Sequence, residues 1–139
     1  MTLTKVLQKV ISVTLSAALM FWQCGFAYAV NVSDWDDLKY YTETYPADVN
    51  VTSALTADSG YPAGTLRINT NGIDITGSTL THNSANSPLI EVNGGVTSFS
   101  VSNNLVGDLV NNGVMAYTGT LSGKVTNAGT ITGVGDFSR

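Results

Sequence analysis

Four similar tetrads of asparagine and glycine recur in the second half of the chain, and they restrict its fold more than any other feature. The tetrads occupy residues 69–72, 92–95, 110–113 and 126–129, and the intervals between them shorten toward the C-terminus. Repetition at about 20 residues is typical of a solenoid, in which each coil buries its apolar side against its neighbours.

Short apolar runs separate the tetrads, as in Leu66-Arg67-Ile68, Ile73-Asp74-Ile75 and Phe99-Ser100-Val101. One coil of a parallel β-helix needs two or three such strands joined by tight turns. We expect Asn and Gly to supply left-handed backbone conformations in these turns, and stacked Asn side chains to bond along the axis. The alternative is an antiparallel β-sandwich with Asn-Gly hairpins. The recurrence of the tetrads favours an all-β, right-handed parallel β-helix of about three to four coils over the sandwich.

A single helix is predicted ahead of these strands, over residues 33–45. Ser33 can cap its free amides, and three aspartates in its first turn oppose the helix dipole. Trp35, Leu38 and Tyr41 fall three residues apart, which gives one apolar face. We assign residues 30–47 to this helix and its lead-in, and residues 48–139 to a β-helix segment that is incomplete at its C-terminal end.

Residues 1–29 have the pattern of a cleavable signal peptide. Lys5 and Lys9 precede an uncharged stretch over residues 10–22, and Ala27-Tyr28-Ala29 places small residues where signal peptidase reads them. We expect cleavage before Val30. The uncharged stretch is short for a hydrocarbon core of about 30 Å, so no stable membrane span is expected after cleavage.

The segment after residue 29 is acidic and contains no cysteine, because Cys24 is the only one in the chain. Stability outside the cytoplasm must then come without disulfides, and a cysteine metal site is excluded. Ten acidic residues outnumber four basic ones in this segment. Such a surface repels nucleic acid, since no counterion release can drive binding, and we expect no nucleic-acid partner.

Two groups of segments resemble a known family. Residues 32–38, 48–52 and 66–68 look like the N-terminal lead-in of pectate-lyase-like right-handed β-helices. Residues 119–133 resemble coils of bacterial autotransporter passengers and related surface adhesins. The resemblance implies a β-helix displayed at, or released from, a bacterial surface, with a short helix covering its first coil.

An enzyme with a β-helix fold would most naturally be a polysaccharide lyase or hydrolase. A hydrolase needs a pair of acids, and a lyase needs a cluster of acids that holds calcium. Asp74, Glu91 and Asp108 are equally spaced along the sequence, which could stack them on successive coils. Each is a lone acid, however, and Asp74 and Glu91 alternate with apolar neighbours as solvent-facing strand residues do. Arg67 has no recurring basic partner, and His82, the only histidine, is expected in an exposed loop. We therefore predict no catalytic, cofactor-binding or metal site, and no enzyme activity.

The function expected from the sequence is a secreted or surface-displayed structural or adhesive segment, with the periplasm as an alternative location. Its expected partners are a host or matrix glycan or protein. The last strand is expected around Ile131 and without a cap, so the coil should either continue or self-associate through its open edge. The alternatives are a carbohydrate-active β-helix and a truncated, non-functional remnant.

Overall fold

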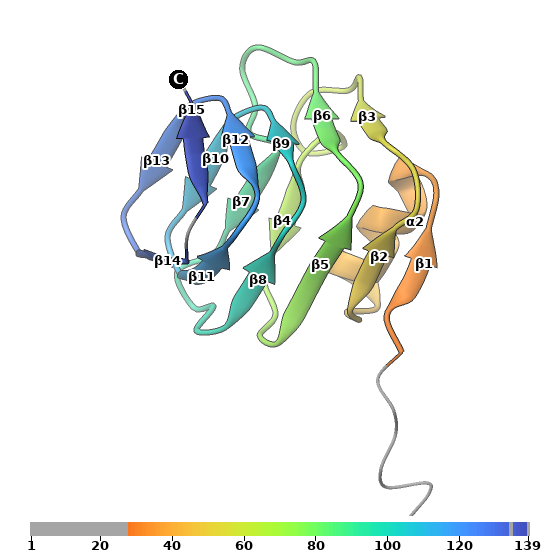
Figure 1. The fold of residues 1–139 in the computed structure, drawn as a ribbon, viewed down its shortest axis with the longest axis horizontal. Helices are drawn as coiled ribbons and strands as arrows, with labels where there is room; N and C mark the ends of the chain where they lie inside the picture. Colours follow the sequence, from red (N-terminus) through yellow and green to blue (C-terminus); the bar gives the residue numbers. More distant parts are fainter. Residues whose placement is uncertain (1–27, 134, 139) are drawn as a thin grey trace, which may run out of the picture.

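A computed structural model describes residues 28–133 and 135–138, so the predicted signal peptide lies almost wholly outside the described residues. The described chain winds into a parallel β-solenoid of about four coils (Figure 1). Three sheets form its sides, and successive strands join them in rotation. All strand pairs with a described register are parallel, which confirms the predicted β-helix and rules out the antiparallel sandwich.

We name the three sheets A, B and C in the order in which each coil visits them. Within the described residues, sheet A contains β1 (Val30–Val32), β2 (Val49–Val51), β5 (Ile73–Gly77), β8 (Phe99–Val101), β11 (Val114–Tyr117) and β14 (Thr130–Thr132). Sheet B contains β3 (Leu55–Ala57), β6 (Leu80–His82), β9 (Leu105–Val106), β12 (Thr120–Ser122) and β15 (Asp136–Ser138). Sheet C contains β4 (Leu66–Ile68), β7 (Ile90–Val92), β10 (Leu109–Asn111) and β13 (Val125–Asn127).

From β2 onward the coils shorten along the chain. In sheet A, Asp74 aligns with Ser100 of the next coil at a sequence separation of 26. Further along, Asn111 aligns with Asn127 in sheet C at a separation of only 16. The last coils are therefore minimal, with very short strands joined by tight corners.

Most strands before β13 point apolar residues inward at alternate positions. Leu66 and Ile68 of β4 are fully buried around the half-buried Arg67, and β7 repeats the pattern with Ile90 and Val92. Alternation with period two is what a strand buried on one face requires. Stacked in register, these residues form one continuous apolar core along the axis.

The helical lead-in closes the first coil. It consists of α2 (Trp35–Lys39) followed by the π-helical turn η1 (Tyr40–Thr44), close to the predicted 33–45. Leu38 is fully buried in the core, and Trp35 packs against it, so the helix covers the first end of the solenoid (Figure 1). The predicted cap was wrong: the side chain of Asp34, not that of Ser33, accepts the amide of Asp37.

All four Asn-Gly tetrads fall at one corner, where sheet C turns into sheet A. Three of them use the same local bond, in which an Asn side chain accepts the Gly amide two residues on. The N···O distances are 3.1 Å from Gly95 to Asn93, 3.3 Å from Gly113 to Asn111 and 3.2 Å from Gly129 to Asn127. The repeat seen in the sequence is thus one turn made again on each coil.

Side-chain amides at this corner also bond from coil to coil. Asn93 donates to Asn69 at 3.2 Å, and Asn111 donates to Asn127 at 2.8 Å. Asn111 is fully buried and also donates to the carbonyl oxygens of Gly113 and Thr130. The predicted amide ladder is therefore present as two short runs rather than one continuous column.

The predicted role of Asn and Gly in these turns was only partly right. No described residue other than glycine has a positive φ, and of the four final glycines only Gly72 does, at 78°. The later glycines are needed for close approach between coils. A Cβ on Gly113 would lie 2.5 Å from the Asn93 carbonyl oxygen, and one on Gly129 would lie 1.9 Å from that of Gly113.

None of the helices in the described part of the chain is long and apolar enough to cross a membrane.

We predict that Asn111→Ala lowers the free energy of unfolding by about 2–4 kcal/mol, because it leaves the buried Gly113 amide and two carbonyl oxygens without the hydrogen bonds that Asn111 makes to them. Urea unfolding of residues 30–139, followed by circular dichroism, measures the change. Asn86, an exposed loop residue without a hydrogen bond in the described structure, supplies the control, and Asn86→Ala should stay within about 0.5 kcal/mol of the parent. Equal effects of the two substitutions would contradict a structural role for the corner amide.

Candidate interaction surfaces

The three acids that the sequence offered as a catalytic set do not meet. Asp74 lies on β5 in sheet A, Glu91 on β7 in sheet C, and Asp108 in the corner before β10. Equal spacing in the sequence does not stack them, because the coils differ in length. The expectation that they could line up on successive coils was wrong.

Two of these acids serve coil-to-coil bonding instead. Asp74 accepts a short hydrogen bond from the Ser100 hydroxyl on the next strand of sheet A. Asp108 accepts the backbone amide of Lys124 at 2.8 Å, one coil further on. Glu91 differs, because its half-buried carboxylate has no hydrogen bond within the described residues.

His82 was expected in an exposed loop, and this was wrong. It ends β6 with only 8 % of its surface exposed. Its Nε2 lies 3.0 Å from the carbonyl oxygen of Ser59, in the turn that leaves β3. A Cβ on Gly64 would lie 2.7 Å from the same nitrogen, so the ring fills a space that this glycine leaves. His82 therefore holds the 58–64 loop against sheet B.

In the ranges 28–133 and 135–138, no three His, Cys, Asp or Glu side chains gather closely enough to hold a metal ion.

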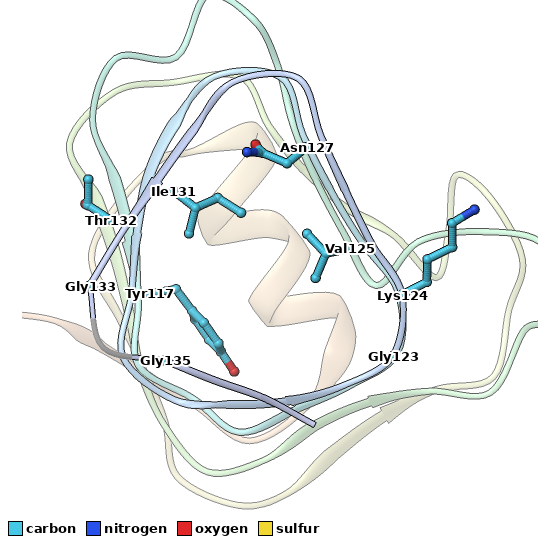
Figure 2. A pocket seen from close by; sticks show the side chains of 9 residues that line it. All are labelled: Tyr117, Gly123, Lys124, Val125, Asn127, Ile131, Thr132, Gly133 and Gly135. Carbon is cyan, nitrogen blue, oxygen red and sulfur yellow. The ribbon is translucent and has the colours of Figure 1, made fainter. Parts of the chain in front are cut away.

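The last coil of the described residues encloses an uncovered hollow of about 790 Å³. Val125, Asn127 and Ile131 point into it from β13 and β14, and Figure 2 looks along the axis past them toward the helix at the far end. Val125 and Ile131 are half-buried, unlike their fully buried counterparts in earlier coils. The apolar core is thus open at this end and closed by α2 at the other.

Strand edges surround the hollow. β13, β14 and β15 each pair with an earlier strand on one side only, within the described part of the chain. The position of β15 corrects the expectation that the last strand lies around Ile131, because β15 pairs with β12 and carries the winding one side further. The Asn127 amide nitrogen also faces this end without a partner among the described residues.

Tyr117 fills the floor of the open hollow. Its side chain is fully buried, and its hydroxyl donates to the Asn103 carbonyl oxygen at 3.3 Å. Burial raises the pKa of Tyr117 to about 12, so the ring stays neutral at ordinary pH. A Cβ on Gly135 would lie 2.4 Å from the Tyr117 ring, which explains the glycine one coil above it.

A second, polar pocket of about 250 Å³ lies on the outer face of sheet C. The side chains around it come from the loop before β4, from β4 and β7, and from the amide corner: they are Tyr61, Arg67, Asn69, Glu91, Asn93 and Asn112. This grouping could not be predicted from the sequence, because Tyr61 belongs to an irregular loop whose path no periodicity predicts.

An ion-pair cluster holds Arg67, one of the residues that line this pocket. Glu43 of η1 contacts Lys39 at 2.6 Å and the Arg67 guanidinium at 2.9 Å, and its carboxylate also accepts the Arg67 backbone amide. Burial works to raise the pKa of Glu43, but the hydrogen bonds from Lys39 and Arg67 outweigh it and the pKa lies below its ordinary value. The hydrogen bond to the Glu43 carboxylate also raises the pKa of Arg67. The Tyr61 hydroxyl is a smaller cause of the same upward shift.

Comparison with protein-family models, with curated proteins and with solved structures finds no match to this chain.

We predict that Glu43→Gln lowers the free energy of unfolding by about 1–2 kcal/mol at pH 7, because it weakens the ion pair with Arg67 that joins η1 to β4 and the ion pair with Lys39 inside the helical lead-in. A folded-state pKa below the unfolded one adds stability that is present above the unfolded pKa and lost as the pH falls through the folded pKa. The difference between parent and variant should therefore shrink below the ordinary pKa of 4.5 and vanish once the carboxyl is protonated. Urea unfolding across this pH range measures it, and a difference that does not change with pH would contradict the ion-pair role.

Proposed function

We propose that this chain is an exported, non-catalytic β-helix segment with a structural or adhesive role at a bacterial surface, similar to part of an autotransporter passenger. One observation carries the proposal: many polar side chains on the outer faces bond to a neighbouring coil, and the three acids considered as a catalytic set lie apart. Asn50 donates to Asn31 across sheet A at 2.8 Å, and Thr120 donates to Asn104 across sheet B at 2.9 Å. The result is a short stack of coils with polar outer walls.

Such a stack of coils is suited to presenting polar groups to a ligand rather than to catalysing a reaction. Amide, hydroxyl and carboxylate groups repeat along each wall at the strand spacing of about 4.8 Å, which gives a ligand many hydrogen-bonding groups at fixed positions. The proposed ligands are a host or matrix glycan or protein. Export rests on the signal-peptide pattern of residues 1–29, and it places the chain outside the cytoplasm, at the cell surface or released from it.

The open end of the solenoid supports self-association as a second part of this proposal. Half-buried Val125 and Ile131 and the unpaired edges of β13, β14 and β15 offer apolar surface and backbone groups to another β-coil. At the first end β1, β3 and β4 are also edge strands within the described residues, but α2 packs over the apolar core there and leaves no comparable apolar hollow. A second copy would therefore meet the open end with its own open end, which gives a dimer rather than a fibre.

We predict that residues 30–139 form dimers at micromolar concentration and that Val125→Lys shifts them toward monomer, because a charge at the rim of the hollow must be desolvated on contact. Val106→Lys is the matched control, since Val106 is 41 % exposed on the side of sheet B and should leave the distribution unchanged. Analytical ultracentrifugation over a concentration series measures both. A folded parent that is monomeric throughout would contradict self-association.

We predict no turnover of pectin-type polymers by residues 30–139, with or without calcium, together with retention of the protein on immobilised glycans or matrix proteins. Unsaturated-product absorbance and reducing-sugar release measure turnover, and surface plasmon resonance measures retention. Turnover that is abolished by Asp74→Ala or Glu91→Ala would overturn the non-catalytic proposal in favour of a carbohydrate-active β-helix.

A further inference from the structure

The pocket on sheet C combines a fixed frame with unused hydrogen-bonding groups. Arg67 and Glu91 lie side by side in register on β4 and β7. The strand residues beside them, such as Ile68 and Ile90, are fully buried, so the backbone that carries the two charges is anchored in the core. The guanidinium is held by Glu43 at 2.9 Å. The positions of these groups are therefore set before any ligand arrives, which lowers the cost of binding.

Several polar groups of the pocket have no partner within the described residues. The Glu91 carboxylate accepts no hydrogen bond, and the Asn112 side chain makes none. Asn69 uses its oxygen to accept from Asn93 and leaves its amide nitrogen unbonded. The pocket thus presents acceptors on Glu91, donors on Asn69 and both kinds on Asn112, around one small space.

An aromatic ring borders these groups. Tyr61 is 56 % exposed and lines the pocket together with Arg67. An exposed ring at this position offers an apolar face next to the polar groups of the pocket. A pyranose has the matching surface, because its C–H groups gather on one face and its hydroxyls, each both donor and acceptor, point outward.

The charges near the pocket select against acidic ligands. Lys39 and Arg67 share the Glu43 carboxylate, and the Glu91 carboxylate brings these four groups to no net charge. The segment beyond residue 29 is acidic as a whole. An acidic sugar would therefore approach an acidic surface with no net positive charge at the pocket to offset the repulsion, whereas a neutral sugar is not repelled.

The volume of the pocket limits the size of the ligand that it can enclose. At about 250 Å³ the pocket is smaller than the roughly 300–1,000 Å³ of sites that enclose drug-sized molecules. One sugar unit fits this space, with the rest of a chain lying along the wall. We propose that this pocket binds one unit of a neutral glycan, with the sugar stacked on Tyr61 and its hydroxyls bonded to Glu91, Asn69 and Asn112. This inference rests on the adhesive role proposed above and names its ligand class and site.

Calorimetric titration of residues 30–139 tests the site with defined probes: cellohexaose, mannohexaose and chitohexaose as neutral glycans, and hexagalacturonate as the acidic one. We expect at least one neutral probe to bind, and the acidic probe to bind at least about tenfold more weakly, which corresponds to roughly 1.4 kcal/mol. Amide chemical-shift changes in ¹⁵N spectra should gather at the residues around the pocket and spare the open end.

Tyr61→Ala and Glu91→Gln should each weaken the neutral probe by about tenfold or more, since each removes a group that the sugar contacts. Glu91→Gln keeps the size of the side chain, so it remains informative if Tyr61→Ala perturbs its loop. Asn86→Ala serves as the control and should bind as the parent does. Circular dichroism of each variant verifies the fold.

Binding by none of the neutral probes, preference for hexagalacturonate, or neutral binding that survives both substitutions would each overturn the site. The adhesive role has a separate readout. If the parent and both variants are retained equally on immobilised matrix proteins, the glycan site fails while adhesion stands. If the parent is retained on no surface but binds a neutral probe through Tyr61 and Glu91, the site stands while the adhesive role fails.

Discussion

Parallel, in-register stacking of coils is the constraint on which the rest of this molecule depends. Each strand is too short to be stable alone, so its backbone bonds and its apolar side chains are satisfied only by the coils above and below. The corner between sheets C and A shows how closely this is enforced. There Gly113 and Gly129 leave room for the backbone of the preceding coil, and Asn111 bonds at once to its own turn and to the next one.

The fold class could be predicted from the sequence, because each Asn-Gly tetrad corresponds to the same turn in one coil after another. Residues such as Leu66, Ile68, Ile73 and Ile75 alternate strictly and mark strands that the structure confirms. β6 around Leu80 was not predicted as a strand, because a single apolar residue makes no alternating pattern. The buried position of His82 was unpredictable for a related reason: its contact with Ser59 depends on the path of an irregular loop.

The candidate surfaces were predictable in unequal measure. The uncovered last coil of the described residues agrees with the sequence pattern, in which the amphipathic helix lies beside the first coil and repeats continue to residues 126–129. The pocket on sheet C did not, because it joins Tyr61 from a loop to Glu91 on a distant strand, and Glu91 reads locally as an ordinary solvent-facing acid. In a solenoid the neighbours of a surface residue lie a whole coil away. Coils that shorten along the chain hide such neighbours from any fixed spacing.

Spin labels can measure the stacking directly. Thr56 and Thr81 lie in register on β3 and β6, and Ser122 continues the same outward row two strands further along sheet B. With nitroxides at Thr56 and Thr81, one strand spacing of about 5 Å apart, the continuous-wave spectrum should show strong dipolar broadening. Labels at Thr56 and Ser122, about 14 Å apart by three such spacings, should broaden far less. Equal, weak broadening in both pairs would contradict parallel coils.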